Sequence, residues 1–298
     1  MEVVPHIDAD AFTRLAHPLL EPDPVRHTSI LTVLPEVRTG ALDAAVMLTV
    51  HENGGVVGAL LRTAGHPALV SAVPPRCAGA VVEALVARDP EVEGVHGPAE
   101  EAEVVGAAWA DRTGAGVTVG LRMRLFALDG LEAPTGVAGA ARAVGPDDAR
   151  GLDLLARWRT EFDREIGRTW RPAPTARDDV VRAVGTGAGE IVWEVDGEPV
   201  AQAAARAVVA GMSRIGPVYT PPEHRGRGYA AAVTAAAARW ALGRGARHVL
   251  LYTDLANPTT NRLYPRLGFR PRYDALELRF VPDHDAPDGA DTAPARPG

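Results

Sequence analysis

Residues 215–230 read IGPVYTPPEHRGRGYA, and this stretch decides how the chain is organised. The apolar segment that ends at Tyr219 predicts a strand, and the small residues after Gly228 predict a long helix. Glycines suit the turn between them because glycine adopts positive φ without steric cost. A glycine-rich turn that opens a helix presents backbone N–H groups at the positive end of the helix dipole. The turn is therefore a candidate pyrophosphate site, to which Arg225 and Arg227 add charged donors.

The glycine pattern alone is shared by more than one class of protein. The dinucleotide-binding fingerprint G-x-G-x-x-A is matched by Gly226, Gly228 and Ala231. Asp254 ends the next predicted strand, about where an acid would bind a ribose. That fingerprint places its first glycine beside the strand, whereas residues 220–225 intervene here. The pattern by itself is therefore a weak indication of dinucleotide binding.

A second resemblance covers more of the chain. Residues 225–230, RGRGYA, match at every defined position the loop Gln/Arg-x-x-Gly-x-Gly/Ala of the GNAT superfamily of acyl-CoA-dependent N-acyltransferases. Residues 257–269, NPTTNRLYPRLGF, resemble that family's Asn-rich helix, its Leu-Tyr pair and its terminal Gly-Phe. The two motifs occur in the family's order, and the resemblance extends over residues 137–281. It implies an α/β (α+β) fold with a mixed twisted sheet flanked by helices.

The resemblance also implies where an acyl-CoA donor binds. Backbone groups of Val218, Tyr219 and Thr220 should bond the pantetheine arm, between two strands that diverge. The N–H groups from Gly226 to Ala230 should hold the pyrophosphate. The complete set of expected donor-binding residues is Val218, Tyr219, Thr220, Arg225, Gly226, Arg227, Gly228, Tyr229, Ala230, Asn257 and Asn261. The two asparagines should bond the loop backbone or the CoA arm, and the first of them is also placed to cap a helix.

Two residues are expected to carry the chemistry, a direct attack of an amine on the thioester. Tyr264 is the candidate general acid, which protonates the departing thiolate; a purely structural aromatic is the alternative. Many members of the family carry a glutamate on the strand before the loop, but residues 212–219, MSRIGPVY, contain no carboxylate. Asp254 is therefore the first candidate for the general base, ahead of Glu223, Glu194 and an ordered water. A capping role for this aspartate stays open.

The predicted elements occur twice in similar order, and the chain as a whole resembles two-domain bacterial GNAT proteins. Hairpins are predicted around residues 52–55 and around residues 196–197. The loop counterpart in the first half, residues 73–80, is VPPRCAGA and lacks the motif. We therefore expect the first half to form a wall of the acceptor site without binding CoA; a module that senses another ligand is the alternative. The expected division is a degenerate GNAT-like domain at 1–130, a linker at 131–136, a catalytic domain at 137–281 and a disordered tail at 282–298.

Some element boundaries are also predicted. The first forty residues should form one or two helices, with Asp8 as the cap of the first and a second start at residues 23–24. A strand is expected at residues 137–144, and the last strand at residues 275–281.

Composition excludes several mechanisms. All 31 basic residues among the 298 are arginines, so neither a Walker A loop nor a lysine Schiff base is possible. The single cysteine excludes an intrachain disulfide, and the nine histidines show no metal-ligand spacing. No apolar run is long enough for a membrane span, and the N-terminus lacks an apolar segment, so we expect a cytoplasmic protein. The net charge of −7 does not favour nucleic acid as a partner.

The expected activity is transfer of an acetyl group from acetyl-CoA to a primary amine of a small molecule, without a metal, by a monomer or homodimer. Two other functions remain open at this point. One is a catalytically silent, CoA-binding regulatory protein, which the missing strand carboxylate favours. The other is an acyltransferase that takes its acyl group from a tRNA. Its basic rim would be formed by Arg262, Arg266, Arg270 and Arg272, together with Arg239, Arg244 and Arg247.

Overall fold

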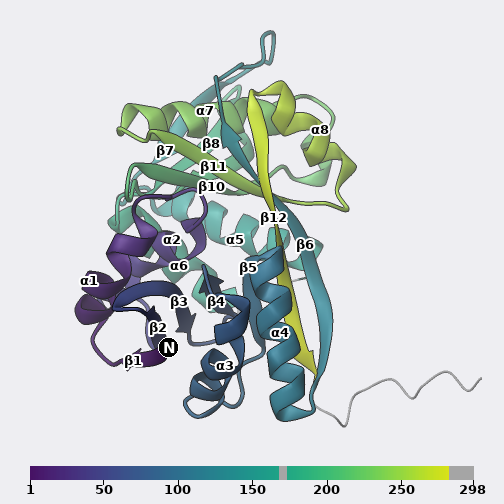
Figure 1. The fold of residues 1–298 in the computed structure, drawn as a ribbon. Helices are drawn as coiled ribbons and strands as arrows, with labels where there is room; N and C mark the ends of the chain where they lie inside the picture. Colours follow the sequence, from purple (N-terminus) through teal and green to yellow (C-terminus); the bar gives the residue numbers. More distant parts are fainter. Residues whose placement is uncertain (168–172, 282–298) are drawn as a thin grey trace, which may run out of the picture.

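The computed structural model describes residues 1–167 and 173–281, which are built around one twisted sheet (Figure 1). The sheet has 12 strands in the order β1-β2-β3-β4-β5-β12-β6-β11-β10-β9-β8-β7. The elements of the first half are β1 (Glu2–His6), α1 (Ala9–Leu20), α2 (Thr28–Arg38), β2 (Ala44–Glu52), β3 (Gly55–Thr63), β4 (Ala68–Ser71), α3 (Ala78–Val86), β5 (Gly94–Pro98), α4 (Ala99–Thr113) and β6 (Gly116–Leu128). Those of the second half are β7 (Ala140–Val144), α5 (Ala149–Glu165), α6 (Ala173–Gly185), β8 (Gly189–Val195), β9 (Glu198–Ala205), β10 (Met212–Tyr219), α7 (Tyr229–Gly243), β11 (His248–Asp254), α8 (Pro258–Arg266) and β12 (Phe269–Val281).

The two halves repeat one order of elements and exchange their last strands. Each half runs strand, two helices, three strands, helix, strand, helix, strand, which confirms the predicted tandem of similar α/β halves. Strand β12 nevertheless pairs with β5 of the first half, from Ala275 to Arg279. Strand β6 pairs with β11 of the second half, from Met123 to Ala127. The long β6–β12 pair therefore runs through both halves, and each half's sheet contains a strand of the other (Figure 1).

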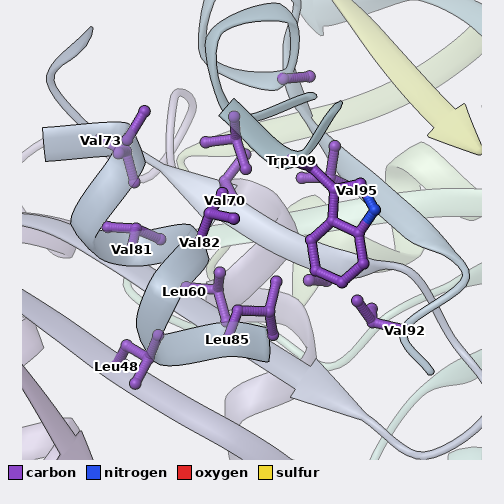
Figure 2. Close-up of a cluster of buried hydrophobic side chains, with 14 of the residues drawn as sticks. Leu48, Leu60, Val70, Val73, Val81, Val82, Leu85, Val92, Val95 and Trp109 are labelled. Carbon is purple, nitrogen blue, oxygen red and sulfur yellow. The ribbon is translucent and has the colours of Figure 1, made fainter. Parts of the chain in front are cut away.

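The core of the first half lies between the sheet and helices α3 and α4 (Figure 2). Leu48, Leu60 and Leu85 are completely buried in it. The exchanged strand β12 contributes Leu276 and Leu278 to the same cluster, and the ring of Phe280 stacks on Trp109 of α4 with centroids 4.3 Å apart. Burial of each such side chain contributes about 1.5–3 kcal/mol. The last strand of the chain is thus part of the first half's core.

Helices also join the halves on the opposite face of the sheet. Helices α1 and α2 bury Phe12 and Ile30 in a cluster that includes Met212 and Leu250 of the second half. In the second half, α7 packs on one face of the sheet and α5 with α6 on the other. No helix within residues 1–167 and 173–281 combines the length and the apolar character that crossing a membrane requires.

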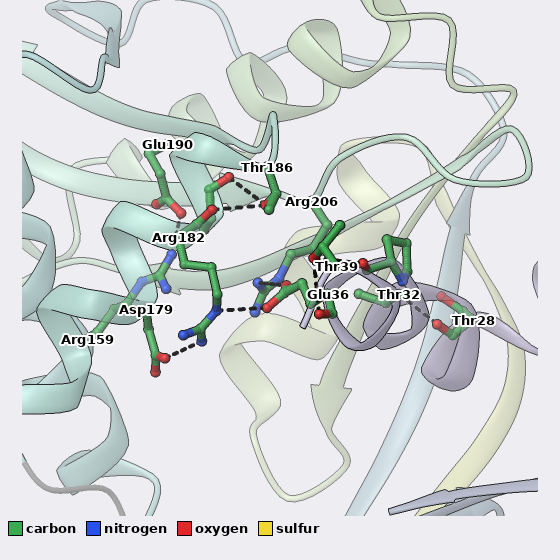
Figure 3. A network of polar contacts seen from close by, with 12 residues as sticks. Thr28, Thr32, Glu36, Thr39, Arg159, Asp179, Arg182, Thr186, Glu190 and Arg206 are labelled. Atoms are coloured by element: carbon green, nitrogen blue, oxygen red, sulfur yellow. Dashed lines mark hydrogen bonds and ion pairs between the residues drawn. The ribbon is translucent and has the colours of Figure 1, made fainter. Parts of the chain in front are cut away.

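An ion-pair network links α2 with α6 and the end of β9 (Figure 3). The carboxylate of Glu36 lies 3.0 Å from Nε of Arg182 and 3.5 Å from Nη1 of Arg206. Arg182 also pairs with Asp179 on its own helix. Because Glu36 is on the first half and its partners are on the second, the network fixes how α2 lies against α6.

The two predicted hairpins are present with the expected turns. Asn53 and Gly54 have φ of 50° and 83°, and Asp196 and Gly197 have φ of 51° and 83°. Both residues of each turn thus have the left-handed conformation that a tight hairpin needs. Asp8 caps α1 as predicted, through a hydrogen bond from the backbone N–H of Asp10.

Several predicted boundaries were wrong. The first forty residues contain a strand, β1, besides the two helices, and Asp23 precedes α2 by a turn because that helix begins at Thr28. Strand β4 was not predicted, β7 begins only at Ala140, and β12 begins at Phe269 instead of residue 275. The short strands lack a readable alternation, and the long one is lengthened by its pairing with β6. The predicted disordered tail at 282–298 lies outside the described residues.

Candidate active site

Strands β10 and β11 diverge in the middle of the sheet. Their parallel ladder runs from Met212 to Ile215 on β10 and ends where Ile215 pairs with Leu251. Beyond this point β10 follows β9, after a bulge between Ile215 and Val218, while β11 follows β6. Residues 216–218 are partly exposed although β10 is an interior strand. The divergence leaves a gap between β10 and β11, in which main-chain groups of β10 have no partner on β11.

The glycine loop continues from β10 into α7. After a short 3-10 turn at Pro222–His224, Gly226 and Gly228 have φ of 77° and 84°, which favour glycine at both positions. A Cβ on Gly228 would also lie 3.2 Å from the side chain of Val137. Gly228 caps α7 without a side-chain hydrogen bond, so the first N–H groups of a 15-residue helix point out of its end. This is the predicted arrangement for an anion.

The arginines of the loop differ in their surroundings. Arg227 is exposed. The guanidinium of Arg225 donates from Nε to the carbonyl oxygen of Thr220 over 2.9 Å and lies 2.7 Å from both carboxylate oxygens of Glu165 on α5. The first charged residue of the motif is therefore already engaged by the chain itself, which the sequence did not indicate.

Tyr219 ends β10 and Thr220 follows it, and their side chains have different surroundings. The buried ring of Tyr219 packs near Trp158, and its hydroxyl donates to Glu161 over 3.2 Å and to Glu165 over 3.4 Å. Burial, with the two carboxylates, raises the pKa of Tyr219 to about 12. The Thr220 hydroxyl is enclosed and has no hydrogen-bond partner among the described residues. The side chain of Tyr219 thus connects the start of the loop to α5.

The two remaining residues of the loop motif begin α7. Tyr229 is almost completely buried in the core under α7, whereas Ala230 is partly exposed. Their side chains therefore contribute to packing, and only their backbone N–H groups are available for a ligand.

A cleft of about 550 Å³ opens between α5 and the end of β10. Its walls combine aromatic, acidic and loop side chains, among them Trp158, Glu161, Glu165, Tyr219, Glu223 and His224. The two glutamates of α5 were missed as candidate site residues. Their spacing of one helical turn within a predicted helix could have placed them on one face, but nothing in the sequence shows that this face meets β10.

The asparagines after β11 hold their own loop. Asn257 caps α8, because its Oδ1 accepts from the N–H groups of Thr259 and Thr260 over 3.1 and 3.2 Å. Asn261 donates to the carbonyl oxygens of Asp254 over 2.9 Å and of Asn257 over 2.8 Å. Both side chains therefore support the loop beside the gap.

The two candidate catalytic residues lie on either side of this loop. Tyr264 of α8 is buried between Phe126 and Phe269, with ring centroids 6.4 and 6.1 Å away. Burial raises the pKa of Tyr264 to about 12, so the phenol stays protonated at neutral pH. Asp254, at the end of β11, is partly exposed, and its Oδ1 accepts from the N–H of Ala256 over 2.8 Å. One oxygen of Asp254 is thus used by a turn.

The other carboxylates considered for the base are placed less favourably. Glu194 is held by Arg142, with Nε 2.7 Å from Oε1. Glu223 lies in the exposed 3-10 turn, on the wall of the cleft. Across the described part of the chain, no group of three or more His, Cys, Asp or Glu side chains could hold a metal ion.

The corresponding place in the first half is closed. Glu101 of α4 extends to the end of β4, where its Oε2 accepts from the backbone N–H of Ala72 over 2.6 Å and its other oxygen pairs with Arg26. Gly97 of β5 also approaches β4 closely, since a Cβ on Gly97 would lie 2.7 Å from the carbonyl oxygen of Val70. The Glu101 carboxylate thus uses a main-chain N–H group at the position where the second half has its gap.

Comparison with known proteins agrees with this geometry. Residues 153–269 match the model of the Acetyltransferase (GNAT) family. The structure is similar to a GCN5-related N-acetyltransferase from Kribbella flavida (TM-score 0.55, 21% identity, 76% of this chain and 88% of that one). It is also similar to a tandem GNAT protein from the clavulanic acid biosynthesis pathway (0.57, 16%, 94% and 98%) and to a GCN5-related N-acetyltransferase from Sphaerobacter thermophilus (0.57, 20%, 94% and 96%). None of the curated proteins matches the chain.

The divergent strands, the glycine loop and the family match together define an acyl-CoA-dependent N-acetyltransferase fold. Residues 153–269 thus carry the GNAT acetyltransferase domain, and the chain as a whole has the fold of two-domain GNAT proteins. A dinucleotide-binding fold is inconsistent with the sheet, in which β4–β5 and β10–β11 are parallel but the other pairs are antiparallel.

Proposed function

We propose that the protein transfers an acetyl group from acetyl-CoA to a primary amine of a small molecule. The observation that carries this proposal is the gap between β10 and β11, which ends at the positive terminus of α7 inside the segment matched by the GNAT model. The backbone of residues 218–220 would hold the pantetheine arm, and the N–H groups of residues 226–230, with Arg225 and Arg227, would hold the pyrophosphate. Asn257 and Asn261 support this site by fixing the loop after β11.

The proposed reaction is a direct displacement. The amine nitrogen attacks the thioester carbonyl carbon, a C–N bond forms, and the C–S bond breaks. Tyr264 gives its proton to the departing thiolate; with a pKa of about 12 the phenol carries this proton at neutral pH. Asp254 takes the proton that the amine loses, directly or through a water, with the carboxylate oxygen that the turn does not use.

The two halves of the chain are proposed to have different roles. Residues 137–281 form the transferring domain, joined through residues 131–136 to a first domain at 1–130 that binds no CoA. Glu101 supports this division, because it occupies the N–H group of Ala72. The exchange of β6 and β12 means that the domains share strands, so the first domain is a structural part of the transferring one.

Release of the CoA thiol tests the proposal. The purified chain should release thiol from acetyl-CoA in the presence of at least one member of a library of amines, including polyamines, aminoglycosides and amino acids. A protein that binds acetyl-CoA but releases no thiol with any amine would contradict the enzymatic part. Binding of tRNA that acetyl-CoA does not displace would contradict the choice of donor.

A further inference from the structure

The ion pair between Arg225 and Glu165 lies where the proposed donor would need the arginine. Arg225 is the first position of the loop motif, and Nη2 of its guanidinium lies 2.7 Å from each oxygen of Glu165. The side chains are 49% and 41% exposed. An ion pair this exposed contributes little to stability, so a stronger anion can replace its carboxylate.

A pyrophosphate is such an anion. It carries more charge than a carboxylate, matches the fork of an arginine, and is drawn to the same place by the terminus of α7. Arg225 would keep its second anchor, the hydrogen bond from Nε to the carbonyl oxygen of Thr220, while its Nη groups change partner. The loop therefore needs no rearrangement for the exchange.

Glu165 is also connected to the cleft. Besides Arg225 it accepts from the hydroxyl of Tyr219 over 3.4 Å, and Glu161 accepts from the same hydroxyl over 3.2 Å. The side chains of Glu161, Glu165 and Tyr219 line the cleft between α5 and β10. Loss of Arg225 would leave the Glu165 carboxylate in this cleft with Tyr219 as its hydrogen-bond donor.

We propose that Glu165 holds Arg225 while no donor is bound, and that the pyrophosphate of acyl-CoA displaces Glu165 from this arginine. This inference rests on the proposed function. Glu165 then opposes donor binding, and the bound donor leaves the Glu165 carboxylate in the cleft without its arginine partner. The residue acts through Arg225 and is a positioning residue of the donor site.

A double-mutant cycle on acetyl-CoA binding tests the exchange. Calorimetric titration of the full chain should show that Glu165→Gln lowers the Kd by roughly twofold to fivefold, since the competing charge is gone. In the Arg225→Ala background the same change should have no such effect. Asp153→Asn is the matched control, because Asp153 is an exposed acid of the same helix, paired with Arg177 away from the loop. It should leave the Kd unchanged.

Two results would overturn the exchange while leaving the proposed function intact. Weaker binding by Glu165→Gln would show that the ion pair holds the loop in the conformation that binds the donor. An equal gain with and without Arg225 would show that Glu165 acts by general charge repulsion. A wild-type chain that binds no acetyl-CoA would overturn the proposed function as well. Thermal unfolding of each variant identifies any that is not folded.

Discussion

Ile215 of β10 and Leu251 of β11 are the last residues at which the two parallel strands of the second half stay paired. Past them, each strand turns to its other neighbour, and the main chain of β10 becomes accessible in the middle of the sheet. At the corresponding place in the first half, Glu101 accepts from the N–H of Ala72, and Gly97 approaches Val70 closely. The two halves of one repeat thus differ at the position where chemistry would occur.

Replacing Tyr264 with phenylalanine should lower kcat by about 10²-fold or more, because a positioned general acid contributes about 10²–10⁴-fold. The Kd for acetyl-CoA should not change, since the ring and its packing against Phe126 and Phe269 remain. Thiol release and calorimetry measure the two quantities. An unchanged kcat would assign Tyr264 to the core alone.

Gly228→Ala should weaken acetyl-CoA binding at least tenfold and lower the free energy of unfolding by about 1 kcal/mol. The reason is that φ of 84° disfavours alanine and the new Cβ would crowd Val137. Gly243→Ala in the last turn of the same helix is the control, because a Cβ there meets nothing within 4 Å. Equal binding by the two variants would remove the loop from the donor site.

Leu278→Ala, in the last strand, should cost about 2–5 kcal/mol of the free energy of unfolding, as expected for a buried leucine. Hydrogen exchange should quicken in α4 and β5 of the first half, because Leu278 pairs with Val95 and approaches Gly106. Leu242→Ala, at a position 42% exposed, should cost within about 0.5 kcal/mol. Faster exchange confined to α7 and α8 would contradict the strand exchange.

The cap of α5 should make stability depend on pH. Asp148 accepts from the N–H of Gly151 over 2.8 Å and from Arg142 over 2.6 Å, and these contacts hold its pKa below the usual value. A lowered carboxylate pKa contributes stability that is present above the unfolded pKa of about 3.9 and is lost as pH falls through the folded one. Asp148→Ala should therefore cost about 1 kcal/mol at pH 7 in urea unfolding, and less as pH is lowered toward 3.

An exposed acid of the same helix controls for the loss of charge. Asp153→Ala should cost no more than about 0.5 kcal/mol at pH 7, because Asp153 is largely exposed and makes no cap. A cost of Asp148→Ala that stays constant from pH 7 to pH 3 would contradict the assignment of this carboxylate as the charged cap.

Local chemistry made several features of both halves predictable. The turns at Asn53 and Asp196 need positive φ, and asparagine, aspartate and glycine are the residues that adopt it most readily. The cap at Asn257 and the loop after Tyr219 follow short motifs that act within a few residues. Such features depend on nearest neighbours along the chain, so the sequence alone indicates them.

Other features depend on partners that are distant in the sequence. The alternating pattern of residues 117–128 predicts a strand, but it does not show that this strand pairs with β11 across the repeat. Likewise Arg225 meets Glu165, and Glu101 meets Ala72, only because helices α5 and α4 return to the ends of the strands. Register and helix placement decide these contacts, and neither is encoded in a local pattern.

We expect one acyl-CoA site in each chain, at the gap of the second half. Calorimetric titration of the full protein with acetyl-CoA tests it most directly. Binding should be saturable with a stoichiometry of one per chain, and it should be lost in an Arg225→Ala/Gly228→Asp variant. A stoichiometry of two, or no binding by the wild-type chain, would contradict it.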